Sequence, residues 1–279
     1  MYRDLEPRTI GGKEFLLAPG RRVSGDPRIE REVLEPSHFQ PKVRSERTLI
    51  GIGGAAVDSN LGVVVDHLPK DGLLAVSTVN TQIPTEQFES YSERFKQMGH
   101  QQEPIHHGVH LIPQEADAAM RIADGMFFTG GDQSRGVDYF SRSGQLGRLH
   151  SFYHSGRIVS GTSAGAHLMG EVTPFHNEVR PGVGLTKLIS FETHLNRRFE
   201  PDQQDRQRRV VDEADVVSVG LEEGGVVVVT NDEKLNFHNK DANLRWRYNG
   251  VQRSREVSPR QEVVVWKLPR KYSILSSEK

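Results

Sequence analysis

The stretch Arg157–Gly170, RIVSGTSAGAHLMG, predicts the architecture of the chain and the position of its reactive centre. An apolar strand end, IV, leads into a turn of small residues, and a helix-forming run follows at Ala164–Met169. Ser163 stands inside this turn between Gly161 and Gly165, which completes a G-x-S-x-G pattern. Between a strand and a helix, such a turn exposes the serine Oγ at the carboxyl edge of a sheet, as a nucleophile requires. Five-residue matches also occur in ordinary strand-to-helix turns, so the role of the serine depends on the rest of the chain.

Strand and helix patterns alternate upstream of this turn, and glycines follow the strands. This alternation is typical of a doubly wound, mostly parallel α/β sheet, whose active sites lie outside the carboxyl ends of its strands. We expect buried strands at 49–52, 73–79, 109–112 and 126–129, and helices at 85–99, 114–124 and 134–156. Downstream, SVGLEEGGVVVV predicts a β-hairpin with its turn at Glu222–Gly225 and its returning strand at Val226–Val229. The segments LRWRYNG and QEVVVWKL predict further strands in a C-terminal β extension.

The composition excludes several classes of protein. The 279 residues include 36 Lys or Arg and 37 Asp or Glu, and this balanced charge argues against a general nucleic-acid binder, which is normally basic. The absence of cysteine excludes disulfides, thiol nucleophiles and cysteine-ligated metals. No apolar run approaches the ~20 residues of a membrane span, and the first residues lack the apolar core of a signal peptide. We therefore expect a cytoplasmic protein that binds neither nucleic acid nor membrane.

The chain divides into an irregular N-terminal arm, residues 1–46, and a single α/β domain, residues 47–279. The arm is rich in charges and prolines and shows little periodicity. We expect it to be extended or to form a short hairpin, with Phe15–Leu17 against Arg22 and Val23. An exposed arm of this kind could pack on a second copy of the chain, so a homodimer is one expectation.

A nucleophilic serine needs a base, and His194 is the best of the 12 histidines. An apolar run precedes it, which places it at the end of a predicted strand and on the same edge as Ser163. A surface histidine at a strand end is the alternative. A carboxylate would orient the imidazole, and Glu222 and Glu223 are the candidates, although paired glutamates in a turn are usually just solvated.

Two further groups of residues could serve an acyl-transfer site. Gly130, Gly131 and Asp132 end a predicted strand, and their backbone could present N–H groups to an oxyanion together with Ala164, the residue after the serine. An ordinary strand-exit turn has the same composition. The guanidinium groups of Arg197 and Arg198 could bind a substrate carboxylate. The more distal Arg206, Arg208 and Arg209 fit that role and a solvated helix face about equally.

Four histidines, His100, His106, His107 and His110, lie close together in the sequence. They lack an acidic ligand at helical spacing and the H-E-x-x-H arrangement of many zinc sites. We therefore interpret them as solvated histidines of a loop, and no metal site is expected.

Five stretches together resemble cyanophycinase and its relative aspartyl dipeptidase, the Ser-His-Glu serine peptidases. They are IGIGGAAVD (50–58), FFTGGDQ (127–133), GTSAGAHLM (161–169), ETHLNRR (192–198) and VGLEEGGVVVV (219–229). They occur in the family's order and cover roughly residues 47–230. The resemblance implies a flavodoxin-like, class I glutaminase-like fold and a hydrolase that needs no cofactor or metal.

The resemblance also implies a role for each matching position. Ser163 matches the nucleophile, His194 the base and Glu223 the residue that holds the base. Backbone donors of the oxyanion hole would come from Gly131, Asp132 and Ala164. The substrate-binding positions of the family correspond to Gln133, Glu192, Thr193, Arg197 and Arg198.

The chain departs from the family pattern around the base. Glu192-Thr193 replaces the usual Asp-Gln, Leu195 replaces phenylalanine, and FEPDQQD stretches the basic segment that follows. The expected activity is therefore a serine exopeptidase on aspartyl peptide links, with cyanophycin, which yields β-Asp-Arg, as the first substrate to consider. An aspartyl or isoaspartyl dipeptidase for short peptides and a non-catalytic relative that binds such ligands are the alternatives.

Overall fold

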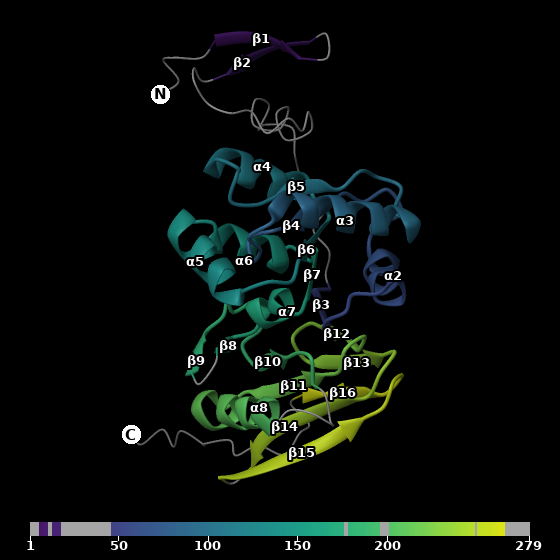
Figure 1. Cartoon of the computed structure of the whole chain (residues 1–279), viewed down its shortest axis with the longest axis vertical. Coiled ribbons are helices and arrows are strands. Elements are labelled where there is room, and N and C mark those ends of the chain that lie inside the picture. Colours follow the sequence, from purple (N-terminus) through teal and green to yellow (C-terminus); the bar gives the residue numbers. More distant parts are fainter. Residues whose placement is uncertain are drawn as a thin grey trace, which may run out of the picture.

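The computed structural model of the chain describes residues 6–10, 13–17, 46–175, 178–195, 201–248 and 250–265. Two sheets carry the fold of this part, one of eight strands and one of four (Figure 1). The larger sheet consists of β3 (Thr48–Ile52), β4 (Leu74–Ser77), β5 (Ile105–His107), β6 (Gly125–Phe128), β7 (Ile158–Thr162), β12 (Val226–Thr230), β13 (Lys234–His238) and β16 (Glu262–Val264). Its spatial order is β16-β13-β12-β3-β7-β6-β4-β5.

The strands from β3 to β5 in this order are parallel, and helices cover both faces of this half of the sheet. Side chains of a strand alternate between the two faces, and β3 shows it: Leu49 belongs to one apolar core, and Ile50 and Ile52 belong to another. Helices α2 (Asp58–His67) and α3 (Pro84–Gln97) cover one face, and α5 (Gln133–Ser143), α6 (Leu146–His154) and α7 (Ala164–Met169) the other (Figure 1). Helix α4 (Pro113–Ile122) packs beside β5. The predicted doubly wound, mostly parallel sheet is confirmed.

The second sheet packs against the central one. It has the order β10-β11-β14-β15, and only β10 and β11 are parallel. Gly51 of β3 allows the close approach of the two sheets, because a Cβ there would lie 3.0 Å from the ring of Phe191. The elements of this region are β8 (Val172–Phe175), β9 (Glu178–Pro181), β10 (Ile189–Glu192), α8 (Pro201–Ala214), β11 (Val217–Leu221), β14 (Ala242–Tyr248) and β15 (Val251–Val257).

The predicted hairpin around Glu222–Gly225 is wrong. Strand β11 belongs to the four-stranded sheet, whereas β12 belongs to the central sheet and pairs with β3 and β13. The turn therefore crosses from one sheet to the other, and the N–H of Gly53 anchors it by donating to the carbonyl of Gly225 over 2.9 Å. Both strands are apolar and buried along almost their whole length. A local pattern of this kind cannot show which neighbour each strand takes.

Two other predictions need correction. The third strand is Ile105–His107 rather than 109–112, because Leu111 and Ile112 lead into α4, where the Ile112 N–H donates to the carboxylate of Glu115 over 3.1 Å. The helix predicted over 134–156 is two helices, α5 and α6. Gly144 separates them because it adopts a left-handed conformation with φ of 73°, which ends α5.

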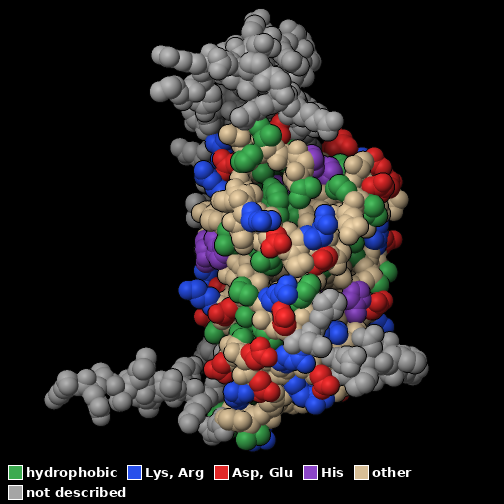
Figure 2. Space-filling model, turned by 60° about the vertical axis from the view of Figure 1, so that its left-hand side comes forward, with side chains coloured by type: hydrophobic (Ala, Val, Ile, Leu, Met, Phe, Trp, Pro, Cys, Tyr) green, Lys and Arg blue, Asp and Glu red, His purple; other side chains and the backbone are tan. Residues whose placement is uncertain are grey.

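In the N-terminal segment, β1 (Glu6–Ile10) pairs antiparallel with β2 (Lys13–Leu17). Phe15–Leu17 thus pairs with residues 6–8, which precede it in the chain. Its predicted partners, Arg22 and Val23, lie outside the described residues, as does most of the predicted N-terminal arm. In the described part of the chain, no helix is both long and apolar enough to span a membrane. Figure 2 shows acidic and basic side chains intermixed over one face of the molecule.

The β7–α7 turn is packed backbone against backbone. A Cβ at Gly161 would lie 2.5 Å from the carbonyl carbon of Gly165, and one at Gly165 would lie 2.3 Å from the carbonyl oxygen of Phe128. Because backbone atoms cannot swing away as a side chain does, both positions require glycine. The elbow pattern is therefore a packing requirement as well as a chemical one.

We predict that Gly161→Ala lowers the free energy of unfolding by about 1–3 kcal/mol, the usual cost of overpacking. Gly62→Ala is the matched control, because Gly62 lies inside α2 with nothing within 4 Å of an added Cβ. It should raise stability by about 0.5–1 kcal/mol, since alanine favours a helix over glycine. Urea unfolding of both variants measures the difference, and equal stabilities would contradict the packing argument.

Candidate active site

Three strand ends meet where the site lies. β3, β7 and β6 are neighbours in the parallel part of the sheet, so their carboxyl ends share one edge. The loop Gly53-Gly54 follows β3, Ser163 follows β7, and Gly130-Gly131 follows β6. Segments far apart in the sequence are thus brought together by strand order alone.

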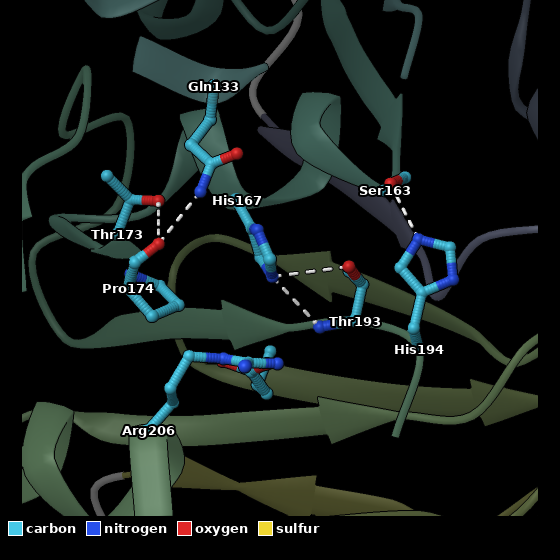
Figure 3. A network of polar contacts seen from close by, with 9 residues as sticks. Gln133, Ser163, His167, Thr173, Pro174, Thr193, His194 and Arg206 are labelled. Atoms are coloured by element: carbon cyan, nitrogen blue, oxygen red, sulfur yellow. Dashed lines mark hydrogen bonds and ion pairs between the residues drawn. The ribbon is translucent and has the colours of Figure 1, made fainter. Parts of the chain in front are cut away.

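Ser163 occupies a strained turn at the start of α7. Its backbone has φ of 53° and ψ of -122°, an uncommon conformation for a residue with a side chain. Its N–H donates to the carbonyl of Ile52 over 3.0 Å, and its own carbonyl accepts from Ala166 and His167. These hydrogen bonds on the N–H and on the carbonyl hold the residue in its strained conformation. The side chain projects away from the helix toward His194 (Figure 3).

Ser163, His194 and Glu223 form a continuous chain of hydrogen bonds. Ser163 Oγ lies 2.7 Å from His194 Nε2 (Figure 3), and His194 Nδ1 lies 2.9 Å from a carboxylate oxygen of Glu223. Since an ionised carboxylate only accepts, the proton of the neutral imidazole is on Nδ1, and Nε2 can accept from the serine hydroxyl. Of the two turn glutamates, it is Glu223 that contacts the imidazole.

The sequence suggested that His194 lies on the same sheet edge as Ser163, but it does not lie on the edge of the central sheet. It follows β10, which belongs to the second sheet. Its N–H donates to the carbonyl of Gly53 over 2.7 Å, and this bond joins the two sheets at the site. The ring lies against Gly54, where a Cβ would be 2.2 Å from His194 Cε1.

The glycine loop after β6 faces the serine. Gly131 has φ of 134°, and a Cβ there would meet the carbonyl of Asn80 at 2.2 Å, so the loop needs glycine to adopt this path. The N–H of Asp132 donates to that same carbonyl over 2.8 Å, which commits it to the loop rather than to an oxyanion. The Asp132 carboxylate caps α5 by accepting from the N–H of Ser134 over 2.9 Å. Of the three predicted donors, Gly131 and Ala164 therefore remain the candidates for an oxyanion hole.

A pocket of about 400 Å³ opens beside this loop. It is lined by Gly131, Asp132, Gln133, His167, Pro174, Phe175 and Arg206. Gln133 Nε2 donates to the Pro174 carbonyl over 2.8 Å, which ties α5 to β8 (Figure 3). Arg206, from α8, is the basic residue of the lining. Its position could not be predicted, because the spacing between His194 and the basic segment differs from that of the family.

The predicted substrate-binding residues next to His194 have protein partners. Glu192 is 1% exposed, and one of its oxygens accepts from Arg206 Nε at 3.1 Å and Nη2 at 2.9 Å. Thr193 is also 1% exposed, and its N–H donates to His167 Nε2 over 3.0 Å (Figure 3). Neither residue is in the lining of the pocket, but each forms a hydrogen bond with a side chain that is, Glu192 with Arg206 and Thr193 with His167. Arg197 and Arg198 lie outside the described residues.

Of the four histidines after α3, His110 is exposed in a turn as expected, but the other three are buried or half-buried. His107 is fully buried in β5 with Nδ1 2.9 Å from the hydroxyl of Ser77, and burial lowers its pKa to about 3. His106 stacks on Phe88 with ring centroids 4.3 Å apart, and burial also lowers its pKa to about 3. The pattern was misleading because two of the histidines are strand residues. No group of acidic residues and histidines that could hold a metal ion occurs within the described ranges.

A serine at a strand–helix elbow, a histidine and a carboxylate in one hydrogen-bonded chain are the arrangement of serine hydrolases. The model of Peptidase family S51 matches residues 81–237, more than half of the chain. The chain belongs to this family and is a serine peptidase. The resemblance seen in the sequence is thereby confirmed at the level of the family.

Solved structures show the same fold. One is the crystal structure of a peptidase from an acI-B1 Actinobacterium, with a TM-score of 0.60 and 14% identity, which covers 78% of this chain and 96% of that one. Another is a putative peptidase E from Listeria monocytogenes EGD-e, with a TM-score of 0.53 and 12% identity, which covers 70% of this chain and 99% of that one. No curated protein matches the sequence significantly.

We predict that Gly54→Ala lowers kcat by about 100-fold, because the added Cβ would push the His194 ring away from Ser163 and such misplacement is costly. Gly99→Ala is the matched control. Gly99 also has a positive φ, of 89°, but nothing lies within 4 Å of an added Cβ. It should lose stability and keep its activity. Equal losses of kcat in the two variants would show that backbone strain, rather than contact with His194, is responsible.

Proposed function

We propose that the protein is a serine exopeptidase that cleaves aspartyl peptide links, with Ser163 as nucleophile, His194 as base and Glu223 as the group that orients it. The observation that carries this proposal is the hydrogen-bonded chain from Ser163 Oγ through His194 to Glu223, at 2.7 and 2.9 Å. Membership of peptidase family S51 supports it.

In the first half of the reaction, Ser163 Oγ attacks the scissile carbonyl carbon while its proton passes to His194 Nε2. Glu223 stabilises the resulting imidazolium through the Nδ1–H bond. The C–N bond then breaks, and the leaving amine takes the proton from His194. In the second half, water attacks the acyl group, again with His194 as base, and Ser163 is released. Every proton in this sequence is carried by His194.

The negative charge of the tetrahedral intermediate needs donors beside the serine. The N–H of Ala164 follows the nucleophile directly, and that of Gly131 belongs to the loop that faces it. A methyl group added at Gly130 would lie only 3.9 Å from Ser163 Oγ, which shows how near this loop comes. Backbone donors held by strand ends need no reorganisation during the reaction, and removal of one oxyanion-hole donor costs about 2.7–4 kcal/mol where it has been tested with a side chain.

The pocket suits an acidic group of the substrate. Arg206 uses two N–H groups to hold the buried Glu192, and a guanidinium has five, so others remain for a ligand in the pocket. The partial neutralisation by Glu192 makes the site less attractive to highly charged anions than a free arginine would be. A single aspartyl carboxylate, bound by directed hydrogen bonds, fits these donors.

Two substrates of this class are distinguished by size. Cyanophycin, a polyaspartate with arginine on each β-carboxyl, follows from the resemblance of the five sequence stretches. Short aspartyl or isoaspartyl peptides are the second candidate, and the observation that favours them is the pair Glu192-Thr193. These residues replace the usual Asp-Gln and are committed to Arg206 and His167.

We predict that the wild type releases β-Asp-Arg from cyanophycin and that Ser163→Ala lowers kcat on the order of 10⁵–10⁶-fold, as loss of a nucleophile does. Mass spectrometry of the products measures both. A panel of Asp-X and isoAsp-X dipeptides, run in parallel, distinguishes the two substrates. Cleavage of the dipeptides alone would reject the polymer. A wild type that cleaves none of them and does not react with a fluorophosphonate would reject the enzyme assignment of Ser163.

We also predict that Arg206→Lys raises KM for aspartyl substrates by about 10- to 100-fold, since a hydrogen bond to a charged group contributes about 1.5–3 kcal/mol. Lysine keeps the positive charge that the buried Glu192 requires but loses the planar fork. Arg208→Lys is the control from the same helix, where Arg208 pairs with Asp205 at 3.0 Å. A KM unchanged by Arg206→Lys would exclude a direct contact of Arg206 with the substrate.

A further inference from the structure

His167 is a second histidine of the site, and it follows Ser163 by four residues along α7. Helix α7 begins directly after Ser163, so His167 is on the same short element as the nucleophile's turn. It forms part of the pocket wall together with Gln133 and Arg206 (Figure 3). Neither the triad nor the oxyanion donors account for a histidine at this position.

The proton of the His167 ring is on Nδ1. The backbone N–H of Thr193 donates to Nε2 over 3.0 Å, and an amide N–H can only donate, so Nε2 carries no proton. Burial, and then the neighbouring His194 and Arg206, lower the pKa of His167 to about 3, so the ring is neutral near neutral pH. The ring therefore accepts from Thr193 through Nε2 and has an N–H donor at Nδ1.

The segment that carries His194 is held by three consecutive backbone N–H groups, those of residues 193–195. They donate, in order, to His167 Nε2 at 3.0 Å, to the Gly53 carbonyl at 2.7 Å and to the Leu221 carbonyl at 2.9 Å. Three different elements thus fix the backbone on both sides of the base. His167 supplies the one acceptor of the three that belongs to a side chain, and so the one that a substitution can remove.

This support matters because His194 itself is strained. Its φ of 57° is in the left-handed region, which is unfavourable for a residue with a side chain. Such a conformation persists only where the surroundings impose it. If the N–H of Thr193 lost its acceptor, the backbone of His194 could relax and carry Nε2 away from Ser163.

We propose that His167 is a positioning residue, which holds His194 in line with Ser163 by accepting the N–H of Thr193 and thereby connects the base to the wall of the pocket. The proposal rests on the proposed function of Ser163 and His194.

Two substitutions distinguish the roles of the two ring nitrogens of His167. The amide oxygen of glutamine can take the place of Nε2, whereas the shorter asparagine reaches only the place of Nδ1. We expect His167→Gln to keep kcat within about threefold of the wild type and His167→Asn to lower it by about 100-fold, since small misplacements of a catalytic group have effects of that size. Because His167 acts through the base, the loss should fall on kcat rather than on KM.

The same exchanges at His150 are the matched controls. His150 lies in α6, and its Nε2 contacts the Val183 carbonyl at 2.7 Å. Both His150 variants should keep the wild-type kcat. A wild-type kcat in His167→Asn, or a loss in His167→Gln as large as that in His167→Asn, would overturn the proposal.

A second measurement tests the role of His167 independently of the proposed substrate class. Reaction of Ser163 with a fluorophosphonate requires the base but no aspartyl group. If the wild type cleaves no aspartyl peptide, the proposed substrate class fails, and the labelling rates of the His167 variants still decide the role of His167. We expect slow labelling of His167→Asn and near wild-type labelling of His167→Gln, and equal rates would overturn the proposal.

A measurement on the wild type does not depend on the folding of any variant. Nitrogen-15 spectra of the histidine rings should show His167 as the Nδ1–H tautomer, without titration between pH 5 and 8. A proton on Nε2, or a titration near the ordinary histidine pKa of about 6.5, would contradict the hydrogen bond on which the proposal depends.

Discussion

The hydrogen bond from the N–H of His194 to the carbonyl of Gly53, 2.7 Å long, joins the two sheets at the site, and the catalytic geometry depends on it. Ser163 belongs to the central sheet, and His194 follows a strand of the second one. The bond forms only because the β3 loop approaches closely, and Gly54 leaves no side chain where the imidazole lies. The packing of the two sheets thereby brings Ser163 Oγ within 2.7 Å of His194 Nε2.

The lining and its immediate partners carry little net charge around Arg206 and His167. Arg206 and the buried Glu192 offset each other, and His167 has its pKa lowered to about 3 and is neutral. Under the proposed function, a substrate would therefore be bound in this pocket through directed hydrogen bonds more than through net charge. Directed hydrogen bonds discriminate by geometry, since a misplaced group leaves a buried donor unsatisfied at a cost of about 1–3 kcal/mol.

The sequence predicted best the features that are local. The elbow at Ser163 could be recognised because a tight strand-to-helix turn demands small neighbours, and the parallel sheet because strands and helices alternate. The prediction failed where an element's neighbour decides its role. The apolar runs at 217–221 and 226–230 look like two arms of a hairpin, yet each pairs within a different sheet. The histidines 106 and 107 look like part of a polar loop, yet they form a strand, because β4 offers an edge to pair with.

The sequence by itself determined that the chain forms a parallel α/β sheet with a serine elbow, because glycine requirements and hydrophobic periodicity act over a few residues. The residues also pointed to His194 as the base, and resemblance to a family added the choice of Glu223 over Glu222. Only the tertiary structure showed the contact of Glu223 with the imidazole, the capping of a helix by Asp132, and the pocket that Arg206 and His167 both line. These contacts join residues from separate elements, and their geometry follows from how the two sheets and α8 pack, which no short segment encodes.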